Sequence, residues 1–122
     1  MSHWSIDHIS AVTLAVRDMA ESIVFYERLG LHVSYGGPHA AFTTMRAARS
    51  VINLRHAPQG SGNRWARVIL WVRGVDALYQ HLRAQGLHPS TPKNAEWGER
   101  YFEISDPDGD VISFAELLDA ID

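Results

Sequence analysis

Hydrophobic and polar residues alternate along two stretches of the chain that nearly repeat each other. Val12–Arg17 and Val68–Arg73 share valine, leucine, valine and arginine at equivalent places, which lie 56 residues apart (68 − 12 and 73 − 17). The alternation places these apolar residues on one side of an extended chain, as in a strand with one buried face. An amphipathic run follows each stretch and ends in Gly-Leu-His, at residues 30–32 and 86–88. This self-similarity predicts two copies of one structural unit within a small domain.

The first copy is predicted to fold as a strand, a helix and three more strands. The first strand is expected over Ile9–Arg17, and Asp18 with Glu21 gives the residue pattern of a helix capping box. Apolar residues recur at helical spacing up to Leu29, and Gly30 supplies the left-handed residue at which helices often end. Three short β-prone segments complete the βαβββ order: Leu31–Tyr35, Ala41–Met45 and Ser50–His56.

The second copy is predicted to repeat this order. Its first strand is expected at about residues 66–73, and the helix that follows has apolar residues at i, i+3, i+4 and i+7 from Val75 and ends at Gly86. Pro89 and Pro92 would confine the next, short strand to a sheet edge. The three remaining strands are expected at Leu87–Ser90, Trp97–Ser105 and Asp110–Leu117.

The two copies define the domain organisation. A linker rich in proline, glycine and serine lies at about residues 58–64, between module one at about residues 6–57 and module two at about residues 65–118. Together the modules are predicted to form a single domain with eight strands and two helices. Residues 106–109, Asp-Pro-Asp-Gly, indicate a tight turn, which accounts for their acidic side chains without a calcium ion.

Composition and charge exclude several classes of function. The 122 residues are 46% hydrophobic and 20% charged, as in one soluble globular domain. A net charge of −3 does not provide the cationic surface that nucleic acids require. The absence of cysteine excludes disulfides, thiolate metal sites and a cysteine nucleophile. The chain has no secretory pattern at its start and no apolar run long enough for a bilayer, so we expect a cytoplasmic protein that does not bind membranes.

Several short motifs occur in one order along almost the whole chain. They are residues 12–18, 25–26, 29–31, 75–79, 97–100 and 106–109. Together they resemble the glyoxalase/bleomycin-resistance/dioxygenase superfamily, also called vicinal oxygen chelate. The resemblance implies an α+β fold of two paired βαβββ modules that form a curved sheet around a U-shaped cavity. It also implies a homodimer in which the second subunit often completes the cavity.

The resemblance locates the positions at which enzymes of this superfamily hold a divalent metal ion through histidine and glutamate. The equivalent positions here carry Ala11, Arg67 and Ser113, and a fourth position that some members use carries Asn53. Arg67 would place a permanent cation where the metal ion should lie, so we expect neither a metal ion nor a cofactor at this place. The seven histidines have no short ligand spacing, and we interpret them as solvent-facing or hydrogen-bonded.

Alternation along the strands indicates which side chains face the implied cavity. If Val68 and Leu70 pack under the helix, then Arg67 and Trp71 face the concave side. Aromatic faces can stack on ligand rings, and arginine can bind an oxygen or a carboxylate. We therefore expect the ligand-binding residues to be Phe42, Asn53, Trp65, Arg67, Trp71, Trp97, Tyr101, Glu103 and Ser113.

Each of these assignments has a structural alternative. A tryptophan such as Trp71 is as readily a core residue, and Arg67 could simply pair with a neighbouring acid such as Glu103. Trp97 opens a glycine-containing loop near the expected cavity rim, which favours a role in binding. Trp4 is expected to pack as an anchor near the start of the chain.

Two classes of function are compatible with these features. The first is a metal-free binding protein of the bleomycin-resistance branch, which sequesters an aromatic drug or metabolite in a dimer cleft and so confers antibiotic resistance. Bleomycin itself is not the expected ligand, because a site for a cationic glycopeptide should be richer in carboxylates. The second is an enzyme, a metal-dependent lyase, isomerase or dioxygenase with a relocated or vestigial metal site, or one that uses Glu103, Arg67 or a histidine for acid–base chemistry. No residue spacing in the sequence identifies a catalytic residue for it. Binding ranks above catalysis, and a role as a scaffold subunit ranks last.

Overall fold

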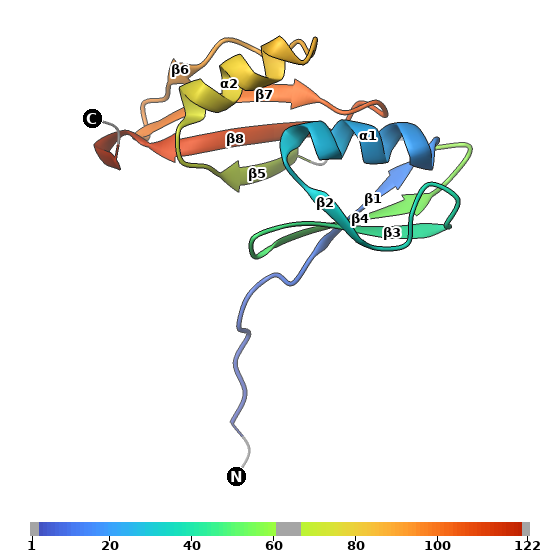
Figure 1. Ribbon diagram of the computed structural model, residues 1–122. Coiled ribbons are helices and arrows are strands. Elements are labelled where there is room, and N and C mark those ends of the chain that lie inside the picture. The colour runs from blue at the N-terminus through green and yellow to red at the C-terminus, as the bar shows by residue number, and fades with distance from the viewer. Residues whose placement is uncertain (1–2, 61–66, 121–122) are drawn as a thin grey trace. The chain divides into compact units, whose positions relative to one another are not determined.

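The structure, a computed structural model, describes residues 3–60 and 67–120 of the chain. Contacts within the chain divide it into two compact units, Met1–Gln59 and Gly60–Asp122. Each unit contains one helix and one four-stranded sheet in the order βαβββ, as Figure 1 shows. The predicted eight strands and two helices are therefore confirmed within the described ranges.

The first unit is built around a sheet that we call sheet 1. Its elements are β1 (Val12–Val16), α1 (Met19–Leu29), β2 (His32–Tyr35), β3 (Phe42–Ala47) and β4 (Ser50–His56). The strand order is β1-β4-β3-β2, with β1 parallel to β4 and the other pairs antiparallel. One face of the sheet packs under α1 (Figure 1), where Leu14, Met45 and Leu54 are buried together with Tyr26 of the helix. Burial of this apolar surface is the main term that stabilises the unit.

Residues next to α1 determine where the helix begins and ends. Asp18 Oδ1 accepts the backbone N–H of Glu21 at 2.9 Å, which satisfies one of the free donors of the first turn. Gly30 has φ 108°, and its N–H donates to the carbonyl of Glu27 at 3.0 Å. Both predicted helix boundaries are confirmed.

The second unit has the same topology around sheet 2. Its elements are β5 (Arg67–Trp71), α2 (Val75–Ala84), β6 (Lys93–Asn94), β7 (Glu99–Ser105) and β8 (Val111–Leu117), followed by a 3₁₀ turn at Leu118–Ala120. The strand order is β5-β8-β7-β6, and β5 is parallel to β8. The helix side of the sheet buries Phe102 and Phe114, and Val75 and Leu82 of α2 are buried as well. The Tyr79 ring of α2 packs edge-on against Phe102 at a centroid distance of 5.7 Å. Neither helix in the described residues is long and apolar enough to cross a bilayer.

The short edge strand is not where the sequence predicted it. It lies at Lys93–Asn94 instead of Leu87–Ser90, because prolines at 89 and 92 remove the N–H groups that a ladder needs. Ser90 instead contacts β7 through two hydrogen bonds outside any strand ladder. Its N–H donates to the carbonyl of Glu103, and its hydroxyl accepts the Glu103 N–H, each at 2.8 Å.

The segment before β1 also differs from the prediction. The first strand begins at Val12 instead of Ile9, since its ladder with β4 begins at the pair Val12 and Ile52. Trp4 was expected to be a packing anchor, but its side chain is 85% exposed. That expectation was wrong, because residues 3–11 form no helix or strand that could carry Trp4 against the core.

Candidate binding surfaces

Sheet 1 has one face under α1 and one face that the helix leaves open. On β4, Ile52 and Leu54 are buried on the helix side, so Asn53 and Arg55 point to the opposite side. The strand register carries this alternation onto β1 and β3. On β1, β3 and β4 the open face of sheet 1 consists of Thr13, Ala15, Phe42, Thr44, Arg46, Val51, Asn53 and Arg55.

Hydrogen bonds form a row across this open face. Thr44 Oγ1 donates to Asn53 Oδ1 at 2.8 Å, and Asn53 Nδ2 donates to Thr13 Oγ1 at 3.5 Å. The three residues lie directly opposite one another in the register. Asn53 was predicted to bind a ligand, whereas Thr44 was not singled out, although it alternates with buried Thr43 and Met45 in the sequence. The row fixes the direction in which the Asn53 amide points.

Sheet 2 is divided in the same way between a face under α2 and an open face. The residues that alternate with the buried Phe102, Ile104 and Phe114 lie on the open side. On β5, β7 and β8 the open face of sheet 2 consists of Arg67, Ile69, Trp71, Glu99, Tyr101, Glu103, Ser105, Val111, Ser113, Ala115 and Leu117. It brings together five of the residues predicted from the sequence: Arg67, Trp71, Tyr101, Glu103 and Ser113.

Three of these residues form a polar network. Arg67 Nη1 lies 3.2 Å from Glu103 Oε2, and the Ser113 hydroxyl donates to the same oxygen at 3.5 Å. Ser113 lies directly opposite Glu103 in the register and is 1% exposed. The predicted alternative that Arg67 pairs with Glu103 is confirmed. The Arg67–Glu103 ion pair therefore places a positive and a negative charge next to each other on the open face of sheet 2.

Aromatic side chains lie beside this network. The Trp97 and Tyr101 rings stack at a centroid distance of 5.9 Å and an interplanar angle of 29°, and Lys93 Nζ lies 5.4 Å from the Tyr101 centroid. The Trp97 indole N–H donates to the Glu99 carboxylate. Trp71 projects from edge strand β5 and is 64% exposed, so its interpretation as a core residue is wrong.

Leu117 and Trp71 line a hollow of about 370 Å³ at the end of β5, together with Val72, Arg73 and Glu116. Leu117 was missed from the sequence because it falls at the end of the last predicted strand. It lies on the same side of β8 as Ser113 and Ala115, opposite to buried Phe114, and it is 48% exposed. The hollow shows that the apolar open face continues past the last ladder pair of β5.

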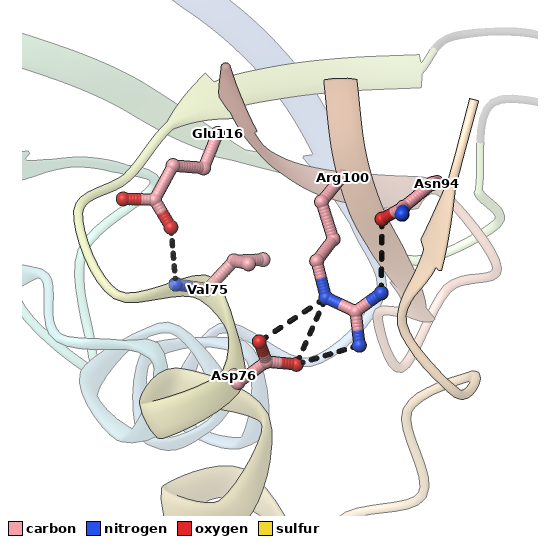
Figure 2. A network of polar contacts seen from close by, with 5 residues as sticks. All are labelled: Val75, Asp76, Asn94, Arg100 and Glu116. Atoms are coloured by element: carbon pink, nitrogen blue, oxygen red, sulfur yellow. Dashed lines mark hydrogen bonds and ion pairs between the residues drawn. The ribbon is translucent and has the colours of Figure 1, made fainter. Parts of the chain in front are cut away.

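Glu116 and Arg100 tie the start of α2 to sheet 2 (Figure 2). Glu116 accepts the N–H groups of Val75 and Gly74, each at 3.0 Å, and these two bonds hold the pKa of Glu116 below its ordinary value. Arg100 donates to both carboxylate oxygens of Asp76 at 3.0–3.1 Å and to the Asn94 side chain at 3.0 Å. One signal of this network is local, since Gly74 provides no side chain to cap the helix.

The donor chemistry does not fit the divalent metal of the superfamily resemblance. Arg67 is a cation already paired with Glu103, and Ser113 donates its hydroxyl proton to the same carboxylate. Ala11 has no donor atom in its side chain. No group of three or more histidine, aspartate or glutamate side chains that could hold a metal ion occurs in residues 3–60 and 67–120. We therefore assign no chemical step to a metal ion.

The remaining predicted residues are divided between the units. Phe42 lies on the open face of sheet 1 and is 38% exposed, and Trp97 stands in the turn before β7. Trp65 lies outside the described residues. Residues 106–109 form the predicted turn, in which Asp106 Oδ1 accepts the N–H groups of Asp108 and Asp110 at 3.0 and 2.8 Å.

Both the sequence and the fold of the chain are similar to those of known proteins. The family model described as Glyoxalase/Bleomycin resistance protein/Dioxygenase superfamily matches residues 5–114. Over 49 residues the chain is 51% identical to bleomycin resistance proteins of Geobacillus stearothermophilus and Staphylococcus aureus, a match that covers 38% of this chain and 37% of theirs. The chain thus matches little more than a third of the length of these curated relatives.

Two solved structures illustrate the similarity of fold. A bleomycin-binding protein complexed with bleomycin has a TM-score of 0.76 at 20% identity, covering 91% of this chain and 98% of its own. TnmS3, an antibiotic binding protein from Streptomyces sp. CB03234, has a TM-score of 0.77 at 28% identity, covering 94% and 99%. The predicted α+β, glyoxalase-like fold of two βαβββ modules is confirmed.

Proposed function

Because the chain belongs to the glyoxalase/bleomycin resistance protein/dioxygenase superfamily, we propose that it is a metal-free binding protein that sequesters an aromatic drug or metabolite without changing it. The names of relatives that bind or resist antibiotics support this class of function. The proposal extends to the nine residues predicted from the sequence as ligand contacts, of which those on the open face of sheet 2 are the best supported.

One observation carries the proposal, the apolar character of the open face of sheet 2. Ile69, Trp71 and Leu117 are 56%, 64% and 48% exposed on neighbouring strands β5 and β8. Burying such residues stabilises a protein, and a patch of them left exposed commonly marks a binding surface. The Arg67–Glu103 pair adds polar groups that can orient a ligand on this apolar surface.

The proposed ligand contact is tested by two substitutions of the same kind at exposed tryptophans. Trp71→Ala removes the aromatic surface from β5, whereas Trp4→Ala removes an equally large side chain that is 85% exposed before β1. A panel of aromatic antibiotics, including bleomycin, is titrated against each variant by fluorescence. Loss of a stacking contact should weaken binding by about tenfold in Trp71→Ala, while Trp4→Ala stays within about twofold of the parent protein. Equal affinities of the two variants would contradict the assignment.

The fate of the ligand distinguishes binding from catalysis. After prolonged incubation with the protein, the bound compound is extracted, and its chromatographic retention and mass are measured. Binding without conversion predicts complete recovery of the starting compound with unchanged retention and mass. A product of altered mass would instead favour a lyase or dioxygenase with a relocated metal site, and a product of the same mass but altered retention would favour an isomerase.

We also propose that the protein is a cytoplasmic homodimer in which the second subunit completes a ligand cleft. Large apolar side chains support a protein partner, since Ile6 and Ile9 before β1 are 86% and 80% exposed in one chain. Sedimentation velocity at several protein concentrations should show a dimer. A monomer at all concentrations would contradict this part of the proposal while leaving ligand binding open to the titration above.

A further inference from the structure

The strands of sheet 1 are unusual in their charge. Within the described residues 3–60, strands β1 to β4 contain no aspartate or glutamate. They carry two arginines, Arg46 and Arg55, and two histidines, His32 and His56. The acids of this part of the chain, Asp7, Asp18, Glu21 and Glu27, lie before β1, at the helix cap or on α1. No strand of sheet 1 therefore supplies a carboxylate to its arginines.

In sheet 2, by contrast, basic residues have partners within the same unit. Arg67 is paired with Glu103 at 3.2 Å, Arg100 with Asp76 at 3.0 Å, and Lys93 lies over the Tyr101 ring. These contacts offset the positive charges within the second unit. An anionic ligand could therefore pair with the arginines of sheet 1, whereas these basic residues of sheet 2 already have partners.

Arg55 is placed to contact such a charge. It lies on the open face between Ala15 on β1 and Phe42 on β3, its two directly opposite neighbours, neither of which is charged. Ala15 has a small side chain, and Phe42 is 38% exposed. Arg46 is less free, because its Nε already donates to Ser34 Oγ at 3.2 Å.

The next row of the sheet complements this arrangement. Thr13, Asn53 and Thr44 lie one strand repeat away from Ala15, Arg55 and Phe42, at roughly 6–7 Å along the strands. Their hydroxyl and amide groups can exchange hydrogen bonds with the polar atoms of a ligand. A cation, an aromatic ring and a hydrogen-bonding row therefore share one face.

We propose that the open face of sheet 1 binds the acidic group of an aromatic acid, a planar ligand that carries a carboxylate or sulfonate. Arg55 contacts the anionic group, Phe42 packs on the ring, and the Thr13–Asn53–Thr44 row contacts further polar atoms. This inference rests on the proposed binding function and specifies its ligand class. Cationic ligands are disfavoured, because the face contains no acid to pair with them.

A pair of fluorescent dyes tests the inference without knowledge of the natural ligand. 8-Anilinonaphthalene-1-sulfonate and 1-anilinonaphthalene share one aromatic skeleton and differ by the sulfonate. The parent protein should bind the sulfonate about fivefold more tightly, since a contact between an exposed arginine and an anion contributes about 1 kcal/mol. Arg55→Gln should remove this preference and leave the affinity for 1-anilinonaphthalene unchanged, whereas Arg55→Lys should retain part of it.

Arg49→Gln is the matched control. Arg49 is exposed in the turn between β3 and β4, so this change removes the same charge without altering the open face. The preference for the sulfonate should survive in this variant. Equal effects of Arg49→Gln and Arg55→Gln, or equal affinities of the parent protein for both dyes, would overturn the inference alone. Failure of both dyes to bind would overturn the proposed binding function, and this inference with it.

Discussion

The carboxylate of Glu116 on β8 caps α2 by accepting the N–H of Val75 at 3.0 Å, across 41 positions of the sequence. The helix has Gly74 at its N-cap position and no side-chain cap from its own segment. The cap instead comes from the strand that pairs with β5, next to the hollow lined by Trp71 and Leu117. The helix and the apolar open face are thereby fixed to the same strand.

Replacing Glu116 should lower stability in a pH-dependent way. The N–H groups of Val75 and Gly74 hold the pKa of Glu116 below its ordinary value, so the carboxylate stabilises the fold above that ordinary pKa. The stabilisation is lost as pH falls through the lowered pKa of the folded state. Glu116→Gln should therefore melt a few degrees below the parent protein at about pH 7, and the difference should shrink towards about pH 3.

Thermal unfolding over this pH range checks the prediction. Glu96→Gln, which removes the same charge from an exposed loop position, is the control and should not reproduce the pH dependence. A gap between Glu116→Gln and the parent protein that is constant with pH would show that the carboxylate charge is not what matters.

Replacing Arg100 by lysine should cause a small loss of stability. Its guanidinium reaches both oxygens of Asp76 and also Asn94, a geometry that a single ammonium group cannot reproduce. Because Asp76 is more than half exposed, we expect Arg100→Lys to lower the free energy of unfolding by no more than about 1 kcal/mol. Urea unfolding measures this value, with Arg49→Lys as the control. A loss equal to that of Arg49→Lys would mean that the bidentate contact contributes nothing.

The turn between β2 and β3 should discriminate between two adjacent glycines. A Cβ at Gly36, where φ is 85°, would lie 2.3 Å from the Phe42 carbonyl oxygen, whereas at Gly37 it would meet nothing within 4 Å. Gly36→Ala should therefore cost about 2–4 kcal/mol of unfolding free energy, and Gly37→Ala about 1 kcal/mol from its positive φ alone. Urea unfolding of both variants provides the comparison. Similar losses would show that the contact with the Phe42 backbone relaxes easily.

The ion pair on the open face of sheet 2 should contribute little to stability. Arg67 and Glu103 are 45% and 35% exposed, and solvent screens such pairs. A double-mutant cycle with Arg67→Met and Glu103→Gln should give a coupling of about 0.5–1 kcal/mol in the free energy of unfolding. A coupling of several kcal/mol would assign the pair to the core instead of to a ligand surface.

The sequence predicted the fold well because its signals were local and repeated. The capping residues at 18 and 21, Gly30 and the alternation in residues 12–17 and 68–73 each specify structure within a few positions. Alternation also placed Arg67 and Trp71 on the open face of sheet 2. The sequence could not show whether Arg67 pairs with Glu103, and the structure shows this pair.

The parts that the sequence did not predict depend on contacts between distant residues. Glu116 is 41 positions from the helix start that it caps, and Arg100 is 24 positions from Asp76. The position of β6 depends on which backbone N–H groups after the two prolines reach β7. No local sequence pattern predicts these pairs. The charge of sheet 1 became evident once Arg55 could be placed beside Ala15 and Phe42.

The most direct test of the account measures ligand affinity before and after removal of divalent metal ions. The protein is dialysed against a chelator, titrated with 1-anilinonaphthalene and with an antibiotic that it binds, and titrated again after Ni²⁺, Mn²⁺, Zn²⁺ or Fe²⁺ is restored. Metal-free sequestration predicts the same affinity in every case and recovery of the antibiotic with unchanged mass. An affinity that returns only with a metal ion, or an antibiotic of altered mass, would contradict metal-free sequestration.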